Sequence, residues 1–223
     1  MAAILAAGVR RPVVVVAMPA YRAERTLAKT LAGIPKGAAD RVLVVDDASP
    51  DGTVDVARDL GLEVVAHGRN VGYGGNQKTC YDRALRAGAD VVVLLHPDYQ
   101  YEPAAVPALV EPIVAGRADF TFGSRFAGGS DPRTGGMPLY RYWGNRLTTA
   151  VVNAWLGTSF TEVHSGFKAY SREFLEAVPY GAFSDDFVFD TQILLEAVVR
   201  GAVVEEVPIP TRYTPESSSI SVL

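Results

Sequence analysis

The sequence predicts an α/β fold with a mostly parallel central sheet covered by helices on both faces. Short β-branched runs alternate with helical stretches along the 223-residue chain, and neither an internal repeat nor a low-complexity linker interrupts them. The length fits one domain, and 48% hydrophobic with 21% charged residues is ordinary globular composition. Polar clusters follow four of the runs, at the edge of the sheet where such folds bind ligands.

Five β-branched runs in the first half predict strands, with a turn or a helical pattern after each. After the second run, SPDGT starts a helix that Ser49 or Asp51 can cap. Glu102-Pro103 opens a later helix, because proline is favoured in a first turn. The predicted strands are Val13–Met18, Arg41–Val45, Leu62–Ala66, Asp90–Leu95 and Asp119–Phe122, and helices are predicted over Glu24–Ala32 and Asn76–Ala87.

The composition changes after Phe122. Residues 123–138 hold five glycines and two prolines and predict a mobile loop. An aromatic-rich helix over 139–157, a short strand over 163–170, a helix over Phe187–Arg200 and a last strand over Val203–Val207 follow. The aromatic residues of 139–157 fit either a core or a membrane-facing surface. The stretch 120–146 carries four arginines against one aspartate. Arginine suits phosphate recognition, and a solvated basic face is the alternative.

Composition also excludes several classes of protein. A single cysteine, Cys80, rules out an internal disulfide and an all-cysteine zinc cluster. The net charge of −4 argues against a generic nucleic-acid binder. No apolar run is long enough to span a bilayer, and the arginines near the N-terminus follow its apolar stretch rather than precede it, unlike a signal peptide. We therefore expect a cytoplasmic protein, and the alternating SSSISVL predicts that the chain continues past Leu223.

Two acidic motifs at predicted strand ends could bind a nucleotide or a metal ion. Asp46 and Asp47 end the second strand, where a carboxylate can hold a ribose hydroxyl or a base N–H. His96, Asp98 and Gln100 follow the fourth strand at alternate positions, and in an extended segment they point the same way. Such a set can bind Mg²⁺ or Mn²⁺ that takes its other ligands from substrate phosphates. A helix cap or turn is the alternative for each motif alone.

Three other nucleotide-binding patterns fit poorly. ILAAG near the start resembles nucleotidyltransferases, but VRRP replaces the glycine-rich continuation. GYGGNQKT has Gln77 where a P-loop needs glycine before its lysine. An NAD-binding domain requires glycines directly after the first strand, and none occurs before Gly33.

The chain resembles the family 2 glycosyltransferases of the GT-A fold, most closely the polyprenyl-phosphate (dolichyl-phosphate) sugar synthases. The resemblance runs from about Val13 to about Tyr213. The segments that match the family are MPAYRAE, VVDDASPDGT, RNVGYGGNQKT, HPDYQYEP, GSRF, PLYRYWGNRLT, HSGFKAYSR and FVFD. Together, in this order and spacing, they are specific. It implies one GT-A domain over 1–223, with a nucleotide-sugar-binding half (1–122) and an acceptor-binding half (123–223).

The resemblance also implies roles for the matching residues. His96, Asp98 and Gln100 would bind Mg²⁺ or Mn²⁺, although His96 replaces the first acid of the family's D-x-D-x-Q and favours Mn²⁺. Arg125 and Arg141 would hold phosphates of the donor or the acceptor. Candidate contacts of the donor nucleotide are Pro19, Ala20, Tyr21, Glu24, Asp46 and Asp47. The glycine-rich turn adds Asn70, Gly72 and Lys78 as candidates, and a purely structural turn is the alternative for these three.

The implied activity is inverting, metal-dependent transfer of a hexose from a GDP- or UDP-hexose to a polyprenyl phosphate, with peripheral contact at the inner face of the membrane. A phosphate acceptor needs no general base, because its second pKa is about 6. A saccharide or small-molecule hydroxyl would need one, and Asp190 is the candidate, with Asp185 and Asp186 as alternatives. A catalytically silent nucleotide-sugar-binding homologue is the third hypothesis.

Overall fold

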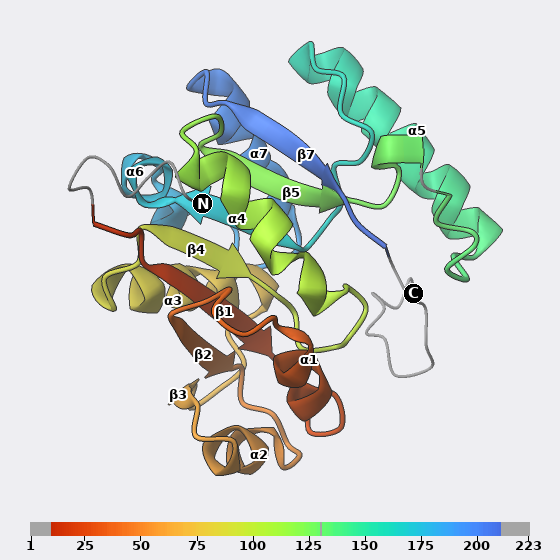
Figure 1. Cartoon of the computed structure of the whole chain (residues 1–223). Coiled ribbons are helices and arrows are strands. Elements are labelled where there is room, and N and C mark those ends of the chain that lie inside the picture. The colour runs from red at the N-terminus through yellow and green to blue at the C-terminus, as the bar shows by residue number, and fades with distance from the viewer. Residues whose placement is uncertain (1–9, 130, 211–223) are drawn as a thin grey trace.

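Seven strands form one mixed sheet in the computed structural model, which describes residues 10–129 and 131–210 (Figure 1). Their order across the sheet is β3-β2-β1-β4-β6-β5-β7, and β6 runs antiparallel to both of its neighbours while the other pairs are parallel. The strands are β1 (Val14–Ala20), β2 (Arg41–Asp46), β3 (Glu63–Ala66), β4 (Val91–Leu94), β5 (Phe120–Ser124), β6 (Lys168–Ser171) and β7 (Val204–Pro208). The mostly parallel α/β sheet predicted from sequence is confirmed.

Helices cover both faces because alternate residues of the buried strands point to opposite sides. In β1, Val14 and Val16 pack in one hydrophobic cluster and Val15 and Ala17 in another. Helices α1, α2 and α4 contribute to the first cluster, and α3, α6 and α7 to the second. The helices are α1 (Leu27–Gly33), α2 (Thr53–Asp59), α3 (Tyr73–Arg86), α4 (Val106–Val114), α5 (Leu139–Leu156), α6 (Arg172–Ala177) and α7 (Val188–Val199).

A helix and a strand start later than predicted, and one helix was not predicted. Helix α1 begins at Leu27 rather than Glu24, and in the turn before it the backbone N–H groups of Arg22 and Ala23 donate to the side chains of Ser49 and Thr53. The strand predicted over 163–170 is confined to β6. Helix α6, which the sequence pattern missed, follows directly and begins where Ser171 Oγ accepts a hydrogen bond from the backbone N–H of Phe174.

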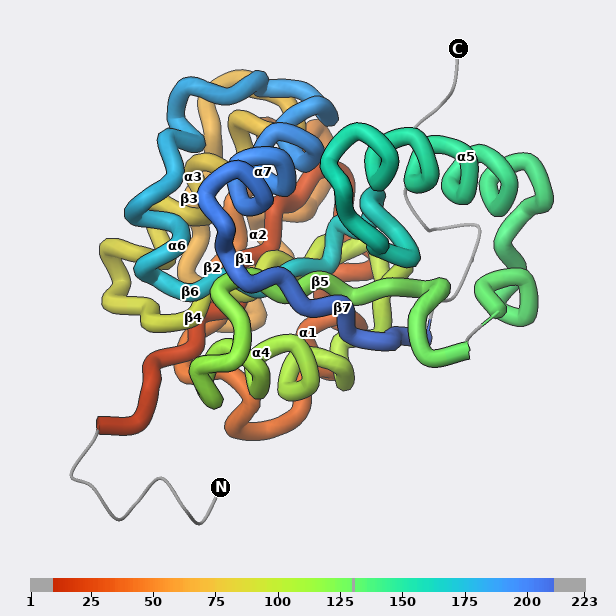
Figure 2. Tube along the Cα trace, turned by 90° about the horizontal axis from the view of Figure 1, so that it is seen from above, coloured from red at the N-terminus to blue at the C-terminus, as the bar shows by residue number. Residues whose placement is uncertain are grey.

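The sheet joins the two halves of the chain, since β4 pairs with β6 along four residues. Helix α5 lies apart from the layers around the sheet, beyond β5 and β7, as both views show (Figure 2). Among the described residues, no helix is both long and apolar enough to cross a bilayer. The predictions about the N-terminal stretch and about continuation past Leu223 concern residues outside those described.

Candidate active site

The carboxyl ends of β1, β2 and β4 lie side by side at one edge of the sheet. The turns that follow them hold Arg22, Ala48 and Tyr99, the three non-glycine residues with positive φ in the described part of the chain. Left-handed backbone at such residues costs free energy and clusters at functional sites. This edge is therefore the candidate active site.

The turn after β1 is tied to the start of α2. Glu24 accepts a hydrogen bond from the backbone N–H of Gly52 at 3.1 Å, so its carboxylate holds this turn. Pro19 and Ala20 are buried within β1 and pair with Val45 and Asp46. Tyr21 is half exposed, and the guanidinium carbon of Arg22 lies 5.3 Å from the centre of its ring.

Asp46 and Asp47 are both buried but differ in their partners. Asp46 Oδ2 accepts the backbone N–H of Ser49 at 2.9 Å, whereas its Oδ1 is buried with no hydrogen-bond partner among the described residues. A buried carboxylate oxygen without a donor is costly, so it points to a donor supplied by a ligand. Asp47 accepts the backbone N–H groups of Val71 (2.8 Å) and Gly72 (3.1 Å), and thereby shapes the turn before α3.

His67 is a site-lining residue that the sequence motifs did not single out. Its Nδ1 lies 2.9 Å from Asp47 Oδ1 and its Nε2 lies 3.0 Å from Thr79 Oγ1. Asn70 donates to the backbone oxygen of Asp47 at 3.2 Å. The structure thus brings His67, Asn70 and Gly72 together around Asp47. No local sequence pattern predicts the contact between His67 and Asp47.

Lys78 reaches a different segment. Its ammonium donates to the carbonyl of Phe183 and to Asp185 Oδ1 at 2.7 Å. The glycines before it also serve this contact, since a Cβ at Gly72, where φ is +91°, would lie 2.5 Å from the carbonyl oxygen of Asp185. The structure therefore uses Lys78 and Gly72 to hold the loop before α7.

The segment from His96 to Gln100 is a turn, so the extended backbone assumed in the prediction for its three side chains is not observed. Strand β4 ends at Leu94, Tyr99 has φ +57°, and Asp98 Oδ1 accepts the backbone N–H of Gln100 at 3.0 Å. The short acidic side chain bonds its own backbone two residues on and curls the chain.

The donors in this turn fit a divalent cation that is bound together with a diphosphate. In the described part of the chain, no group of three or more His, Cys, Asp or Glu side chains is placed to hold a metal ion alone. Asp98 and Gln100 offer hard oxygen ligands at the carboxyl end of β4, and Mg²⁺ or Mn²⁺ commonly takes its remaining ligands from substrate phosphates.

His96 and Asp190 both contact the hydroxyl of Tyr73, close to this turn. Burial lowers the pKa of the His96 imidazole, and the nearby carboxylates of Asp98 and Asp190 only partly oppose this effect. Asp190 accepts hydrogen bonds from Tyr73 (2.8 Å) and Gln77 (3.2 Å). Both of its oxygens are therefore engaged by the protein. Its neighbour Asp186 accepts the backbone N–H of Val188 at 2.8 Å, at the start of α7.

Arg125 and Arg141 occupy different surroundings. Arg125 is buried, and its guanidinium donates to Glu162, with Nε 2.8 Å from Oε1. Asn145 of α5 donates to the same carboxylate oxygen at 2.9 Å, so Glu162 connects the end of β5 with α5. Arg141 is partly exposed on α5, where its Nε lies 3.1 Å from the hydroxyl of Tyr140.

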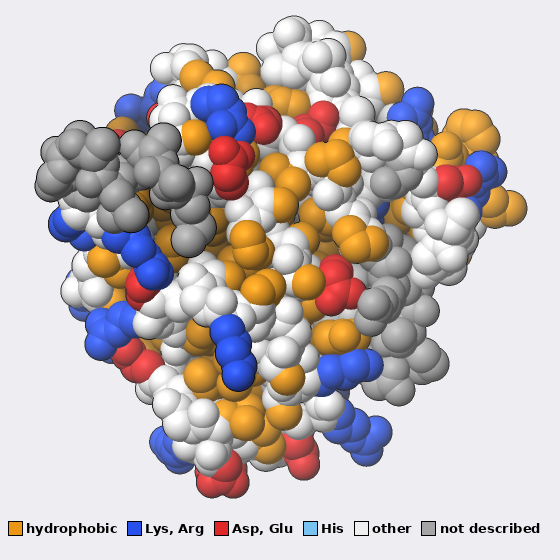
Figure 3. Space-filling model, viewed as in Figure 1, with side chains coloured by type: hydrophobic (Ala, Val, Ile, Leu, Met, Phe, Trp, Pro, Cys, Tyr) orange, Lys and Arg blue, Asp and Glu red, His pale blue; other side chains and the backbone are white. Residues whose placement is uncertain are grey.

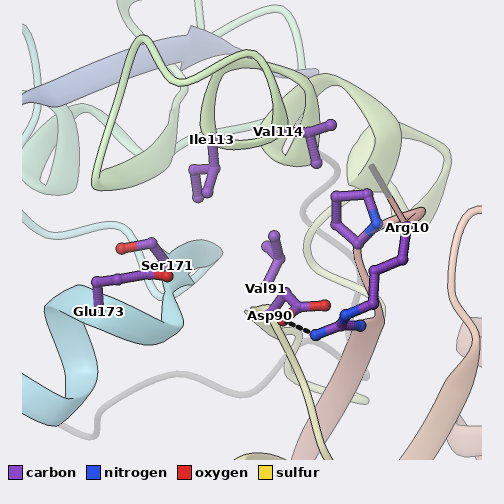
Figure 4. A pocket seen from close by; sticks show the side chains of 8 residues that line it. Arg10, Asp90, Val91, Ile113, Val114, Ser171 and Glu173 are labelled. Atoms are coloured by element: carbon purple, nitrogen blue, oxygen red, sulfur yellow. Dashed lines mark hydrogen bonds and ion pairs between the residues drawn. The ribbon is translucent and has the colours of Figure 1, made fainter. Parts of the chain in front are cut away.

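A separate cavity of about 300 Å³ lies at the opposite edge of the sheet (Figure 4). It is lined at the amino end of β4 by Val91 and by the ion pair between Arg10 and Asp90, 2.7 Å apart. It contains none of the residues predicted from the sequence motifs.

Comparison with known proteins places these features in a family. The model of glycosyl transferase family 2 matches residues 15–178. The polyprenol monophosphomannose synthase of Mycolicibacterium smegmatis is 31% identical over 175 residues, which cover 75% of this chain and 65% of that protein, just under two thirds. The undecaprenyl-phosphate mannosyltransferase of Micrococcus luteus is 30% identical over 202 residues, covering 86% of this chain and 80% of that protein.

Solved structures show the same fold. The crystal structure of glucosyl-3-phosphoglycerate synthase from Mycobacterium tuberculosis, in complex with Mn²⁺, UDP and phosphoglyceric acid, aligns with a TM-score of 0.68 at 23% identity. The alignment covers 92% of this chain and 72% of that one. The shared architecture is the GT-A fold.

Proposed function

Because the chain belongs to glycosyl transferase family 2 and is a glycosyltransferase of the GT-A fold, we propose that it transfers a hexose from a GDP- or UDP-hexose to a polyprenyl phosphate, with inversion at the anomeric carbon. Residues 1–122 would bind the donor and residues 123–223 the acceptor. The names of the two mannosyl-transferring relatives support a lipid phosphate as acceptor.

The observation that supports a lipid acceptor is a stripe of exposed apolar side chains on α5. Its large side chains face outward along one side of the helix, and Trp143, Leu147 and Trp155 are 67%, 68% and 70% exposed. The opposite side carries polar residues that contact the protein, Asn145 and Asn153 among them. A helix with its apolar face outward needs a nonpolar partner. The α5 stripe comprises Leu139, Tyr140, Trp143, Leu147, Val151 and Trp155.

Charge on the same helix favours an anionic membrane as that partner. Helix α5 contains Arg141 and Arg146 and no acidic residue. Figure 3 shows hydrophobic and basic side chains next to one another at the edge of the molecule where α5 lies. A helix with aromatic and aliphatic residues flanked by arginines is suited to lie in a membrane interface. We therefore place the protein peripherally at a membrane, on the side where lipid phosphate is presented.

The donor side of the proposal uses the carboxyl edge of β1, β2 and β4. Tyr21 offers a face for the base, and the orphaned oxygen of Asp46 can accept from a base N–H or a ribose hydroxyl. Asp98 and Gln100, with His96, would hold Mg²⁺ or Mn²⁺. Such an ion, when bound, stabilises negative charge on the departing diphosphate.

Sugar transfer then requires little proton chemistry from the protein. An oxygen of the acceptor phosphate attacks the anomeric carbon, the bond from that carbon to the diphosphate oxygen breaks, and the nucleoside diphosphate leaves with the electron pair. The acceptor is already anionic near neutral pH, since the second pKa of a phosphate monoester is about 6. Transfer to a phosphate therefore needs no general base. This agrees with the surroundings of Asp190, whose two carboxylate oxygens already accept hydrogen bonds from Tyr73 and Gln77.

The choice of acceptor is tested with two lipids that differ in one group. Purified protein is incubated with radiolabelled GDP-mannose or UDP-glucose, Mn²⁺ and either a polyprenyl phosphate or the matching polyprenol. We expect label to enter the organic phase only with the phosphate. Transfer to the polyprenol, or to a water-soluble hydroxyl acceptor in place of the lipid, would show instead that the enzyme uses a hydroxyl acceptor.

A further inference from the structure

Asp190 is the centre of a polar cluster behind the His96–Gln100 turn. Its side chain is 16% exposed and receives partners from two other elements. Lys168 of β6 forms an ion pair with it, with Nζ 2.7 Å from Oδ1, although the angle falls short of a hydrogen bond. Tyr73 and Gln77 of α3 donate hydrogen bonds to it, and Tyr81 in turn fixes Gln77 at 2.8 Å.

The hydroxyl of Tyr73 connects Asp190 to His96. It donates its proton to Asp190 Oδ2 at 2.8 Å, and His96 Nε2 lies 3.3 Å from the oxygen of the Tyr73 hydroxyl. A hydroxyl has one proton to give, so the bond with His96 requires Nε2 to be the donor. A neutral imidazole that is protonated at Nε2 keeps a lone pair on Nδ1.

The packing of the ring fixes its orientation as well. A Cβ built at Gly166 would lie 3.0 Å from His96 Cδ2 and 3.1 Å from Nε2, so this edge of the ring faces Gly166. Nδ1 is the ring atom opposite that edge and points away from Gly166. The ring also lies parallel to that of Tyr73, with centroids 5.4 Å apart and an interplanar angle of 5°.

We propose that Asp190 is a positioning residue that acts through Tyr73 on His96. It fixes the tautomer and the orientation of the imidazole, so that Nδ1 presents a lone pair to the divalent cation at Asp98. The inference rests on the proposed function, because that cation belongs to the donor diphosphate. It differs from the role of general base that the sequence suggested for Asp190 in the case of a hydroxyl acceptor.

The two roles predict different effects of removing the link. Tyr73→Phe deletes only the hydroxyl and leaves Asp190 with Lys168 and Gln77. If Asp190 positions His96, metal-dependent binding of UDP or GDP weakens roughly threefold to tenfold, the worth of about one hydrogen bond. Asp190→Ala gives a loss of similar size, and the double variant loses no more than the larger single loss, because both act through one hydroxyl.

Calorimetric titration with UDP and with GDP, with and without Mn²⁺, measures these effects without turnover. Nucleotide affinity without metal is expected to stay unchanged in Tyr73→Phe. Tyr180→Phe is the matched control, since its hydroxyl donates to a carboxylate, Asp82, at 2.7 Å. It should bind nucleotide as the wild type does. Thermal unfolding of each variant shows that it is folded, and Tyr73→Phe remains informative if Asp190→Ala does not fold.

Two results would overturn the inference while the proposed function stands. One is unchanged metal-dependent binding in Tyr73→Phe. The other is an Asp190→Ala variant that binds nucleotide normally but loses kcat, which would make Asp190 a general base. If the wild type itself binds neither UDP nor GDP in the presence of Mn²⁺, the proposed function fails first, and that outcome is distinct from both.

Discussion

Glu162 is a residue whose importance lies in its partners. It is fully buried, its carboxylate faces the guanidinium of Arg125, and Asn145 donates to it from α5. Breaking a buried ion pair from one side leaves a charge without compensation and costs about 3–5 kcal/mol. We therefore expect Glu162→Gln to lower the free energy of unfolding by about 3 kcal/mol in urea titrations.

The exposed pair of Glu111 and Arg117, 2.6 Å apart, is the control for that prediction. Solvent screens such pairs, so Glu111→Gln should leave the urea midpoint unchanged. Equal effects of the two substitutions would show that Glu162 contributes no more than a surface charge. The ion pair with Glu162 also affects the predicted role of Arg125. Its buried guanidinium already donates to a carboxylate, which limits the contact that it can make with a substrate phosphate.

His96 makes stability depend on pH. Burial lowers the pKa of its imidazole below the ordinary value of 6.5, so the unfolded chain binds this proton more readily than the folded one. The contribution of His96 to stability should therefore be fully present above pH 6.5, and should be lost as the pH drops from there through the folded-state pKa. Melting temperatures of the metal-free protein between pH 8 and pH 5 should decline more steeply in the wild type than in His96→Gln. Parallel declines would contradict this account.

At the scale of elements, α5 gives the most direct prediction. Trp143→Gln combined with Leu147→Gln removes two exposed side chains of the α5 stripe. We expect the variant to fold normally but to lose flotation with vesicles that contain anionic lipid, because apolar burial in the interface drives this binding. Val199→Gln, an exposed apolar residue on α7, is the matched control and should still bind vesicles. Undiminished flotation of the double variant would remove α5 from the membrane surface.

The sequence was most informative for elements whose residues carry a local pattern. Buried parallel strands are nearly continuous β-branched runs, and β1 and β2 lie within two residues of their predicted limits. The His96–Gln100 turn was misread, because alternating polar residues fit a strand as well as a turn made by Asp98. For α5 the aromatic content fitted either core or surface, and only the observed exposure decides between them.

Contacts between distant residues could not be predicted from one sequence. Gln77 and Asp190 are 113 positions apart, and no local sequence pattern predicts that they form a hydrogen bond. The same holds for Arg125 and Glu162, which are 37 positions apart. The proposed roles of the site residues therefore remain predictions, whereas the positions of their side chains and partners follow from the fold.

Over the whole molecule, one sheet carries both proposed substrate sides. Its β3-β2-β1-β4 part presents the donor edge, and β6, β5 and β7 lead to α5 (Figure 1). Antiparallel pairing of β4 with β6 brings Lys168 opposite Leu94, and so places the cluster around Asp190 next to the His96–Gln100 turn.

The central claim is that the edge formed by β1, β2 and β4 binds a nucleoside diphosphate together with a divalent cation. Calorimetric titration of the wild type and of Asp98→Asn with UDP and GDP, with and without Mn²⁺, tests it most directly. We predict tight binding of one nucleotide by the wild type only when Mn²⁺ is present, and loss of that metal-dependent part in Asp98→Asn. If neither nucleotide binds at millimolar Mn²⁺, or if Asp98→Asn binds as the wild type does, the assigned site is wrong.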